Sequence, residues 1–101
     1  MINKILDFYK NSNYDFRKFA FEYDPLKIRF NEWVDYYRMK WAISKAIEAR
    51  TILEIGVRYG YSAHAFLSAS PQAKYIGVDA DEPSFGGDIG AVDWAREALQ
   101  Q

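Results

Sequence analysis

The chain has 101 residues and carries 13 Lys and Arg against 14 Asp and Glu, for a formal net charge of −1. This length suits one small domain, and 50% hydrophobic residues, with 18% aromatic ones, are enough for a real core. The charge balance gives no overall case for a nucleic acid or a membrane surface as partner. Disulfides and zinc–thiolate sites are excluded because the sequence has no cysteine.

The N-terminus indicates a cytoplasmic protein. Its first ten residues, MINKILDFYK, include an acid and lack the apolar region and the small-residue cleavage site of a signal peptide. No apolar run reaches the roughly 18 residues that a membrane span needs. The missing cysteines also fit a reducing compartment. We therefore expect a cytoplasmic location and no membrane partner.

The two halves of the chain differ in charge and in aromatic content. Residues 1–50 hold 10 Lys and Arg and 7 Asp and Glu (net +3), whereas residues 51–101 hold 3 and 7 (net −4). Twelve of the eighteen aromatic residues also lie in the first half. Because they recur at helical spacing and the positive charge is small, they indicate core or interface positions rather than an RNA-binding surface.

Helical periodicity dominates the first half. Residues 2–9 carry apolar side chains at the spacing i, i+3, i+4, i+7 and predict an amphipathic helix. The apolar stripe between residues 16 and 23 predicts a second helix, which Asp24-Pro25 ends because the residue before a proline disfavours the α region. After a loop, Asn31 is an N-cap residue type at the start of a longer helix over residues 31–49. Four aromatic residues of that helix are more typical of a core than of a substrate cage: Trp33, Tyr36, Tyr37 and Trp41.

The second half alternates strands and helices. The apolar run at 52–57 predicts a central parallel strand that is buried on both faces. A turn bracketed by glycines leads into a helix over 61–69, and a second strand covers 75–80. The loop at 81–90 contains Gly86-Gly87, which provide conformational freedom, and a further helix begins at residue 91. This β-α-β-α order opens a doubly wound α/β sheet.

Two parallel strands make a poor sheet by themselves, because their edges remain unpaired. We therefore expect an incomplete sheet. Either the chain is the front of a longer domain, which we favour, or another chain completes the sheet. The second case includes a homo-oligomer formed through the exposed sheet edges.

The junction at residues 51–62, TILEIGVRYGYS, has the chemistry of a ligand-binding turn. A strand–glycine–helix junction points unpaired backbone N–H groups at a ligand. A phosphate-binding P-loop is disfavoured, since only three residues separate Gly56 from Gly60 and no lysine follows. The dinucleotide pattern G-x-G-x-x-G is weakened, because Arg58 occupies its second glycine position.

The motif E-x-G-x-x-x-G-x-S, with an acid at the end of the next strand, resembles the class I S-adenosylmethionine-dependent methyltransferases. LEIGVRYGYSA is similar to the first motif of the catechol O-methyltransferase-like O-methyltransferases, and YIGVDAD is similar to the ribose-binding motif that follows it. The resemblance covers about residues 33–100. It implies N-terminal helices (1–30) followed by the first β-α-β-α of a Rossmann-like doubly wound parallel sheet (31–101), which is incomplete here.

The resemblance also assigns residues to the cofactor, S-adenosyl-L-methionine. The methionine part would lie against Gly56 and the backbone from Arg58 to Gly60, and Glu54 would help to hold its amino group. Asp79 would accept both ribose hydroxyls, with Asp81 or Glu82 in that role if the strand ends later. The seven predicted cofactor-binding residues are Glu54, Gly56, Arg58, Gly60, Tyr61, Ser62 and Asp79.

Elementary chemistry supports this assignment at two positions and leaves others open. An ionised carboxylate can accept from a vicinal diol, and a buried Glu54 needs a partner or a ligand. The guanidinium of Arg58 pairs with Glu54 or Asp79, or is exposed. Tyr61 either packs in the core or binds the cofactor. The only histidine, His64, falls within a helix, and we interpret it as a surface or packing residue.

The implied reaction is transfer of the sulfonium methyl group to a nucleophile, most often a hydroxyl of a small-molecule acceptor. In this family the acceptor site, the base and any magnesium ligands come from later strands, so we name no catalytic residue and no metal ligand. The 101 residues alone should bind the cofactor weakly or not at all, and should not catalyse. The alternatives are a non-catalytic Rossmann-like association module and an NAD-dependent oxidoreductase.

Overall fold

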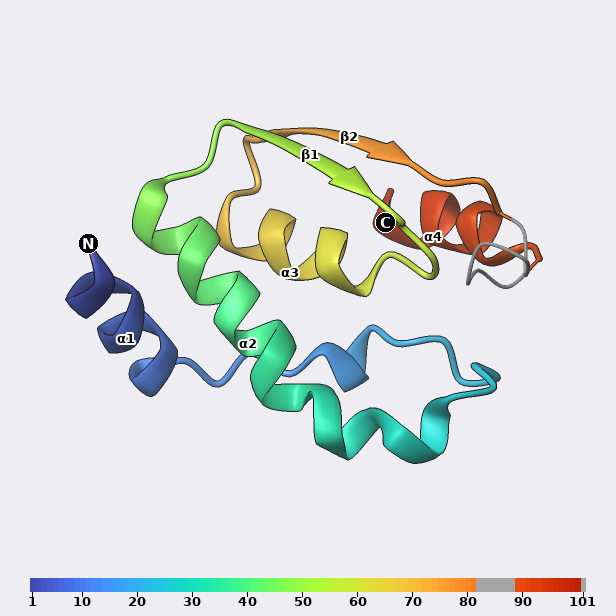
Figure 1. The fold of residues 1–101 in the computed structure, drawn as a ribbon, viewed down its shortest axis with the longest axis horizontal. Coiled ribbons are helices and arrows are strands. Elements are labelled where there is room, and N and C mark those ends of the chain that lie inside the picture. The colour runs from blue at the N-terminus through green and yellow to red at the C-terminus, as the bar shows by residue number, and fades with distance from the viewer. Residues whose placement is uncertain (82–88, 101) are drawn as a thin grey trace.

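The computed structural model describes residues 1–81 and 89–100 as a mixed α/β fold, in which helices lie on one side of two parallel strands (Figure 1). In chain order the α-helices (α), 3₁₀ turns (η) and strands (β) are α1 (Ile2–Asn11), η1 (Phe16–Lys18), η2 (Lys27–Arg29), α2 (Phe30–Ile47), β1 (Thr51–Ile55), α3 (Tyr61–Ala69), β2 (Lys74–Val78) and α4 (Ala91–Leu99). The α/β class and the β-α-β-α order agree with the sequence-based prediction.

Within the described residues, helices cover only one face of the sheet. Alternate side chains of a strand point to opposite faces. On β1, Ile52 points toward the helices and is buried, whereas Leu53 and Ile55 are 66% and 82% exposed. In the parallel register their partners are Ile76 and Val78, which are also exposed. The prediction that β1 is buried on both faces is therefore wrong for the described residues, because no described element covers this outer face.

Small residues let α2 and α3 approach each other closely. Ala42 and Ala46 of α2 are buried, and the hydroxyl of Ser44 between them donates to the carbonyl of Phe66 on α3 at 2.9 Å. The helix predicted over 31–49 is confirmed as α2, which starts one residue earlier and ends two residues earlier. Asn31 is not its N-cap, because the helix already starts at Phe30 with Arg29 in the N-cap position. The Asn31 side chain instead accepts a hydrogen bond from the guanidinium of Arg17.

The predicted second helix over residues 16–23 is wrong, since only the single turn η1 forms there. The side chain of Asp15 accepts from the amide of Arg17 at 3.0 Å and starts this turn. Phe16 is fully buried, with ring centroids 5.2 Å from Phe30 and 4.5 Å from Tyr37. The burial of Phe16 against α2 sets the path of the chain in this segment. The helical spacing of its apolar residues does not predict that path.

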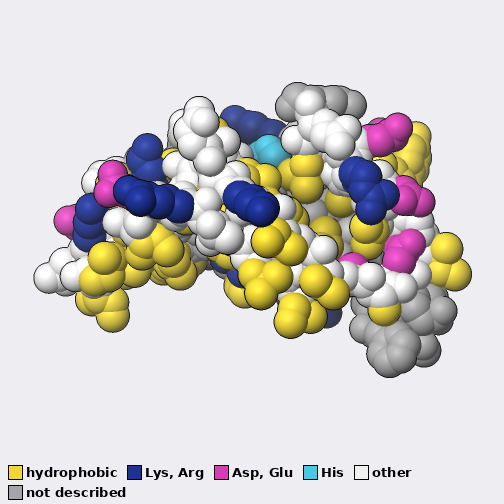
Figure 2. All heavy atoms as spheres, turned by 90° about the horizontal axis from the view of Figure 1, so that it is seen from above, with side chains coloured by type: hydrophobic (Ala, Val, Ile, Leu, Met, Phe, Trp, Pro, Cys, Tyr) yellow, Lys and Arg dark blue, Asp and Glu magenta, His cyan; other side chains and the backbone are white. Residues whose placement is uncertain are grey.

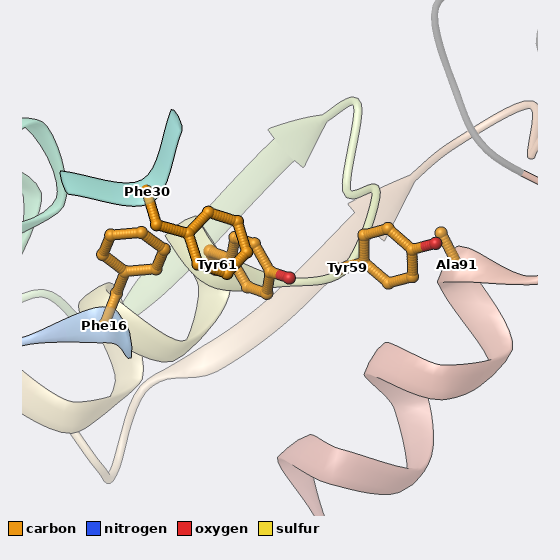
Figure 3. Close-up of a cluster of buried hydrophobic side chains, with 5 residues drawn as sticks. All are labelled: Phe16, Phe30, Tyr59, Tyr61 and Ala91. Atoms are coloured by element: carbon orange, nitrogen blue, oxygen red, sulfur yellow. The ribbon is translucent and has the colours of Figure 1, made fainter. Parts of the chain in front are cut away.

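The core joins this N-terminal segment to the glycine turn. Its buried members come from five parts of the chain (Figure 3): Phe16, Phe30, Tyr59, Tyr61 and Ala91. Partly buried aromatic residues surround them, including Trp33 on α2 and Trp94 on α4. The expectation that many of the aromatic residues form the core is confirmed, and the core lies directly beneath the predicted ligand turn.

Candidate functional site

The turn between β1 and α3 contains three residues with left-handed backbone. The φ angles are +89° at Gly56, +50° at Arg58 and +79° at Gly60, a region that glycine adopts without steric cost. The amide of Gly56 donates to the carbonyl of Val78 at 2.7 Å, and the amide of Gly60 donates to the carbonyl of Val57 at 2.9 Å. The turn is thus tied to the end of β2 at one side and begins α3 at the other.

The two glycines face different surroundings. A Cβ on Gly60 would lie 2.9 Å from the Cβ of Ala95, because α4 packs directly on that end of the turn. A Cβ on Gly56 would have nothing within 4 Å. The side of the turn at Gly56 is therefore open to a ligand, whereas the side at Gly60 is filled by protein.

Asp79 lies at the end of β2 and holds the turn from across the sheet. Its Oδ2 accepts from the amide of Arg58 at 2.7 Å, and its Oδ1 accepts from the amide of Asp81 at 2.7 Å. These backbone donors, first of all the Arg58 amide, place the pKa of Asp79 below its usual value. The carboxylate is therefore ionised at neutral pH, at the edge of the sheet where the two parallel strands end.

The guanidinium of Arg58 pairs with a residue for which the sequence suggested no such role. It donates to both carboxylate oxygens of Asp24, at 2.8 and 2.6 Å. Asp24 also accepts from the hydroxyl of Tyr61 at 2.8 Å and from the amide of Leu26 at 2.8 Å. The Asp24 side chain has no exposed surface. The loop that precedes α2 is thus fastened to the glycine turn by a buried ion pair.

A pocket of about 260 Å³ opens between α2, the end of β1 and the turn. It brings together five of the seven predicted cofactor-binding residues, while Gly60 and Asp79 do not line it. Its lining residues are Tyr36, Tyr37, Lys40, Glu54, Ile55, Gly56, Val57, Arg58, Tyr59, Tyr61 and Ser62. Lys40 is not among the residues predicted from the sequence. The signal for it is its place on one helix face, four residues after Tyr36 and four before the buried Ser44.

Glu54 and Tyr61 have protein partners of their own. The hydroxyl of Tyr75 donates to Oε1 of Glu54 at 2.6 Å, and burial together with this carboxylate raises the pKa of Tyr75. Tyr61 is buried in the core, and its hydroxyl accepts from the amide of Phe21 at 3.0 Å while it donates to Asp24. Glu54 thus has its second oxygen available to a ligand, whereas the polar end of Tyr61 is engaged by protein.

His64 packs against the N-terminal segment, which confirms its interpretation as a surface or packing residue. Its ring stacks on Phe19 with centroids 4.0 Å apart, and its Nδ1 lies 2.6 Å from the hydroxyl of Tyr14. Burial lowers the pKa of His64.

Three predicted positions fall outside the residues that the structure describes. Glu82 and Gly86-Gly87 lie in the part that the structure does not describe. Among residues 1–81 and 89–100, no group of three or more His, Cys, Asp or Glu side chains is arranged to hold a metal ion. In the same residues, no helix has the length and apolar character to cross a membrane.

We compared the chain with protein-family models, with curated proteins and with solved structures, and none of them matched. The site must therefore be interpreted from its own geometry and chemistry.

Proposed function

We propose that the chain binds S-adenosylmethionine at the turn between β1 and α3, as the front half of a class I methyltransferase that acts on a small-molecule hydroxyl. The observation that supports this best is the 2.7 Å hydrogen bond from the turn amide of Arg58 to the carboxylate of Asp79. It joins the expected ribose acceptor to the glycine turn at one edge of a parallel sheet. Ligands of open α/β sheets bind at that edge.

The available groups suit this cofactor. Each carboxylate oxygen of Asp79 receives an amide hydrogen bond and keeps a lone pair for a ribose hydroxyl. Glu54 presents an acid to the pocket, which favours an amine-bearing sulfonium ligand. The guanidinium of Arg58 is already bound by Asp24, so it is a poor counter-ion for the diphosphate of NAD. The cofactor would supply the methyl group, and we assign no catalytic base.

A titration followed by ¹H–¹⁵N correlation spectra tests the proposal, since it detects binding even at millimolar affinity and locates it. We expect S-adenosylmethionine and S-adenosylhomocysteine to shift the amide signals of Gly56, Ser62 and Asp79, and NAD to leave them in place. Shifts with NAD alone would support an oxidoreductase instead. No response to any of the three ligands would overturn the proposal.

A separate variant tests whether Asp79 binds the ribose of the cofactor. Asp79→Ala should weaken binding of S-adenosylhomocysteine at least about tenfold, because hydrogen bonds to a charged group contribute roughly 1.5–3 kcal/mol each. Asp93→Ala is the matched control, since this carboxylate lies exposed on α4. The spectra report whether the turn remains folded. Unchanged affinity in Asp79→Ala would show that another group holds the ribose.

A second candidate function, a non-catalytic association module, is favoured by the uncovered face of the sheet. Figure 2 looks onto the strand side of the molecule and shows hydrophobic side chains gathered over its centre. The exposed residues of β1 and β2 on this face are Leu53, Ile55, Ile76 and Val78. A second copy of the chain would bury the same face on both partners. A stable dimer in sedimentation experiments, together with no binding of S-adenosylmethionine, S-adenosylhomocysteine or NAD, would favour this candidate.

A further inference from the structure

The pocket beside the turn is lined by an acid, Glu54, assigned above to the amino group of the ligand, and by a base, Lys40, which has no role so far. Its volume of about 260 Å³ is below the roughly 300–1,000 Å³ of pockets that hold a whole drug-sized ligand. It therefore suits one end of a ligand rather than all of it. The charged lining residues are Lys40, Glu54 and Arg58, and Arg58 is neutralised by Asp24.

Lys40 reaches the pocket from the middle of α2. Its Nζ donates to the hydroxyl of Ser62 at 2.6 Å and lies 4.4 Å from the ring centre of Tyr36. In the part of the chain that the structure describes, no carboxylate forms an ion pair with it. An ammonium group has three donors, so the hydrogen bond to Ser62 leaves donors for an anion.

The position of Ser62 adds to the attraction for an anion. Ser62 is the second residue of α3 (Tyr61–Ala69), and the first turn of a helix carries unpaired N–H groups and a partial positive charge. Lys40 therefore stands beside a helix N-terminus, and both favour the same anionic group. A carboxylate bound there would meet a full charge and backbone donors together.

Glu54 supplies the opposite charge in the same pocket. Its Oε1 is engaged by the hydroxyl of Tyr75, which fixes the carboxylate at the end of β1 and leaves Oε2 for a cationic donor. An α-amino acid group carries an ammonium and a carboxylate on one carbon. A pocket with an acid on the strand side and a base on the helix side is complementary to that zwitterion.

We propose that Lys40 binds the α-carboxylate at the amino acid end of the ligand. The hydroxyl of Ser62 positions the ammonium group of Lys40 for this contact. This inference rests on the proposed function and adds a specificity that the function does not require: the chain should discriminate against ligands that lack the carboxylate. The chemical class recognised is an adenosyl sulfonium or thioether that ends in an α-amino acid.

The experiment compares S-adenosylmethionine with decarboxylated S-adenosylmethionine, using the 101-residue chain and the same spectral titration. The wild-type chain should bind the carboxylated ligand about tenfold to hundredfold more tightly, as expected for hydrogen bonds to a charged group. Lys40→Met keeps the length and the apolar stem, and should bring the ratio of the two affinities close to one. Lys40→Arg should retain most of the preference.

The control variant is Lys45→Met, which removes an exposed lysine from the last turn of the same helix and should leave the ratio unchanged. Equal binding of both ligands by the wild-type chain would overturn this inference and leave the proposed function standing. An equal loss of both ligands in Lys40→Met would also overturn it, since that result indicates a structural role. Binding of neither ligand by the wild-type chain would overturn the proposed function and this inference together.

Discussion

Removal of the Asp24 carboxylate is the sharpest test of how the N-terminal segment supports the turn. Asp24→Ala deletes two hydrogen bonds from Arg58, one from Tyr61 and one from the amide of Leu26. Loss of one partner of a buried ion pair costs about 3–5 kcal/mol. The Arg58 side chain is 22% exposed, so water can partly solvate its charge, and we expect about 3 kcal/mol, at the low end of that range.

That loss is large for a chain of this size, because small domains have a total unfolding free energy of roughly 5–15 kcal/mol. Urea unfolding followed by circular dichroism measures it as a lower midpoint with an unchanged slope. Asp93→Ala serves as the control, since the Asp93 side chain is 80% exposed and exposed ion pairs contribute at most about 1 kcal/mol. If Asp24→Ala shifts the midpoint no more than Asp93→Ala, the buried pair does not fasten the turn.

The same carboxylate should make stability depend on acid. Burial alone would raise the pKa of Asp24, but the hydrogen bonds from Arg58, the Leu26 amide and Tyr61 outweigh it and hold the pKa below its usual value. A lowered folded-state pKa means that the stabilisation is present above about pH 4 and is lost as the pH falls further. Urea midpoints between pH 6 and pH 3 should therefore fall less in Asp24→Ala than in the wild-type chain. Parallel profiles would contradict this assignment.

Two further expectations concern the packing of α4 and the uncovered sheet face. Gly60→Ala should destabilise the chain by about 1–3 kcal/mol, because the added methyl group would lie 2.9 Å from the Cβ of Ala95 in a left-handed backbone. The control is Gly90→Ala, which has a similar φ but open space around the added methyl group and should destabilise the chain less. Equal unfolding midpoints for the two variants would refute the crowding argument. Ile55→Lys should reduce any concentration-dependent association seen by sedimentation, since Ile55 is the most exposed apolar residue of the outer sheet face. The control is Glu32→Lys, which changes an exposed residue of α2. An equal reduction of association in both variants would exclude this face as the contact.

Much of the second half of the chain could be predicted because its signals are local. The predicted helix over 61–69 coincides with α3, and the two strands are confirmed with ends shifted by one or two residues. Glycines punctuate this region, and the left-handed φ values at Gly56 and Gly60 are the conformations that glycine supplies. The seven cofactor-binding assignments stay predictions, of which five residues now share one pocket.

The segment between α1 and α2 could not be predicted in the same way, because long-range contacts override its periodicity. The stripe from Phe16 to Tyr23 has helical spacing, yet its rings pack in several directions against α2, α3 and α4. The pairing of Arg58 with Asp24 joins residues 34 positions apart. No local pattern in the sequence indicates which acid such an arginine will meet.

The sequence by itself determined the order of strands and helices from β1 onward, the position of the glycine turn and the acid that follows β2. These depend on backbone sterics and on the alternation of apolar side chains, which act between near neighbours. Only the tertiary structure decided which charged and polar groups meet: Arg58 with Asp24, Tyr75 with Glu54, and Lys40 with Ser62. The physical reason is that charged and polar groups gain most where folding removes water from both partners, and that depends on how separate elements pack together.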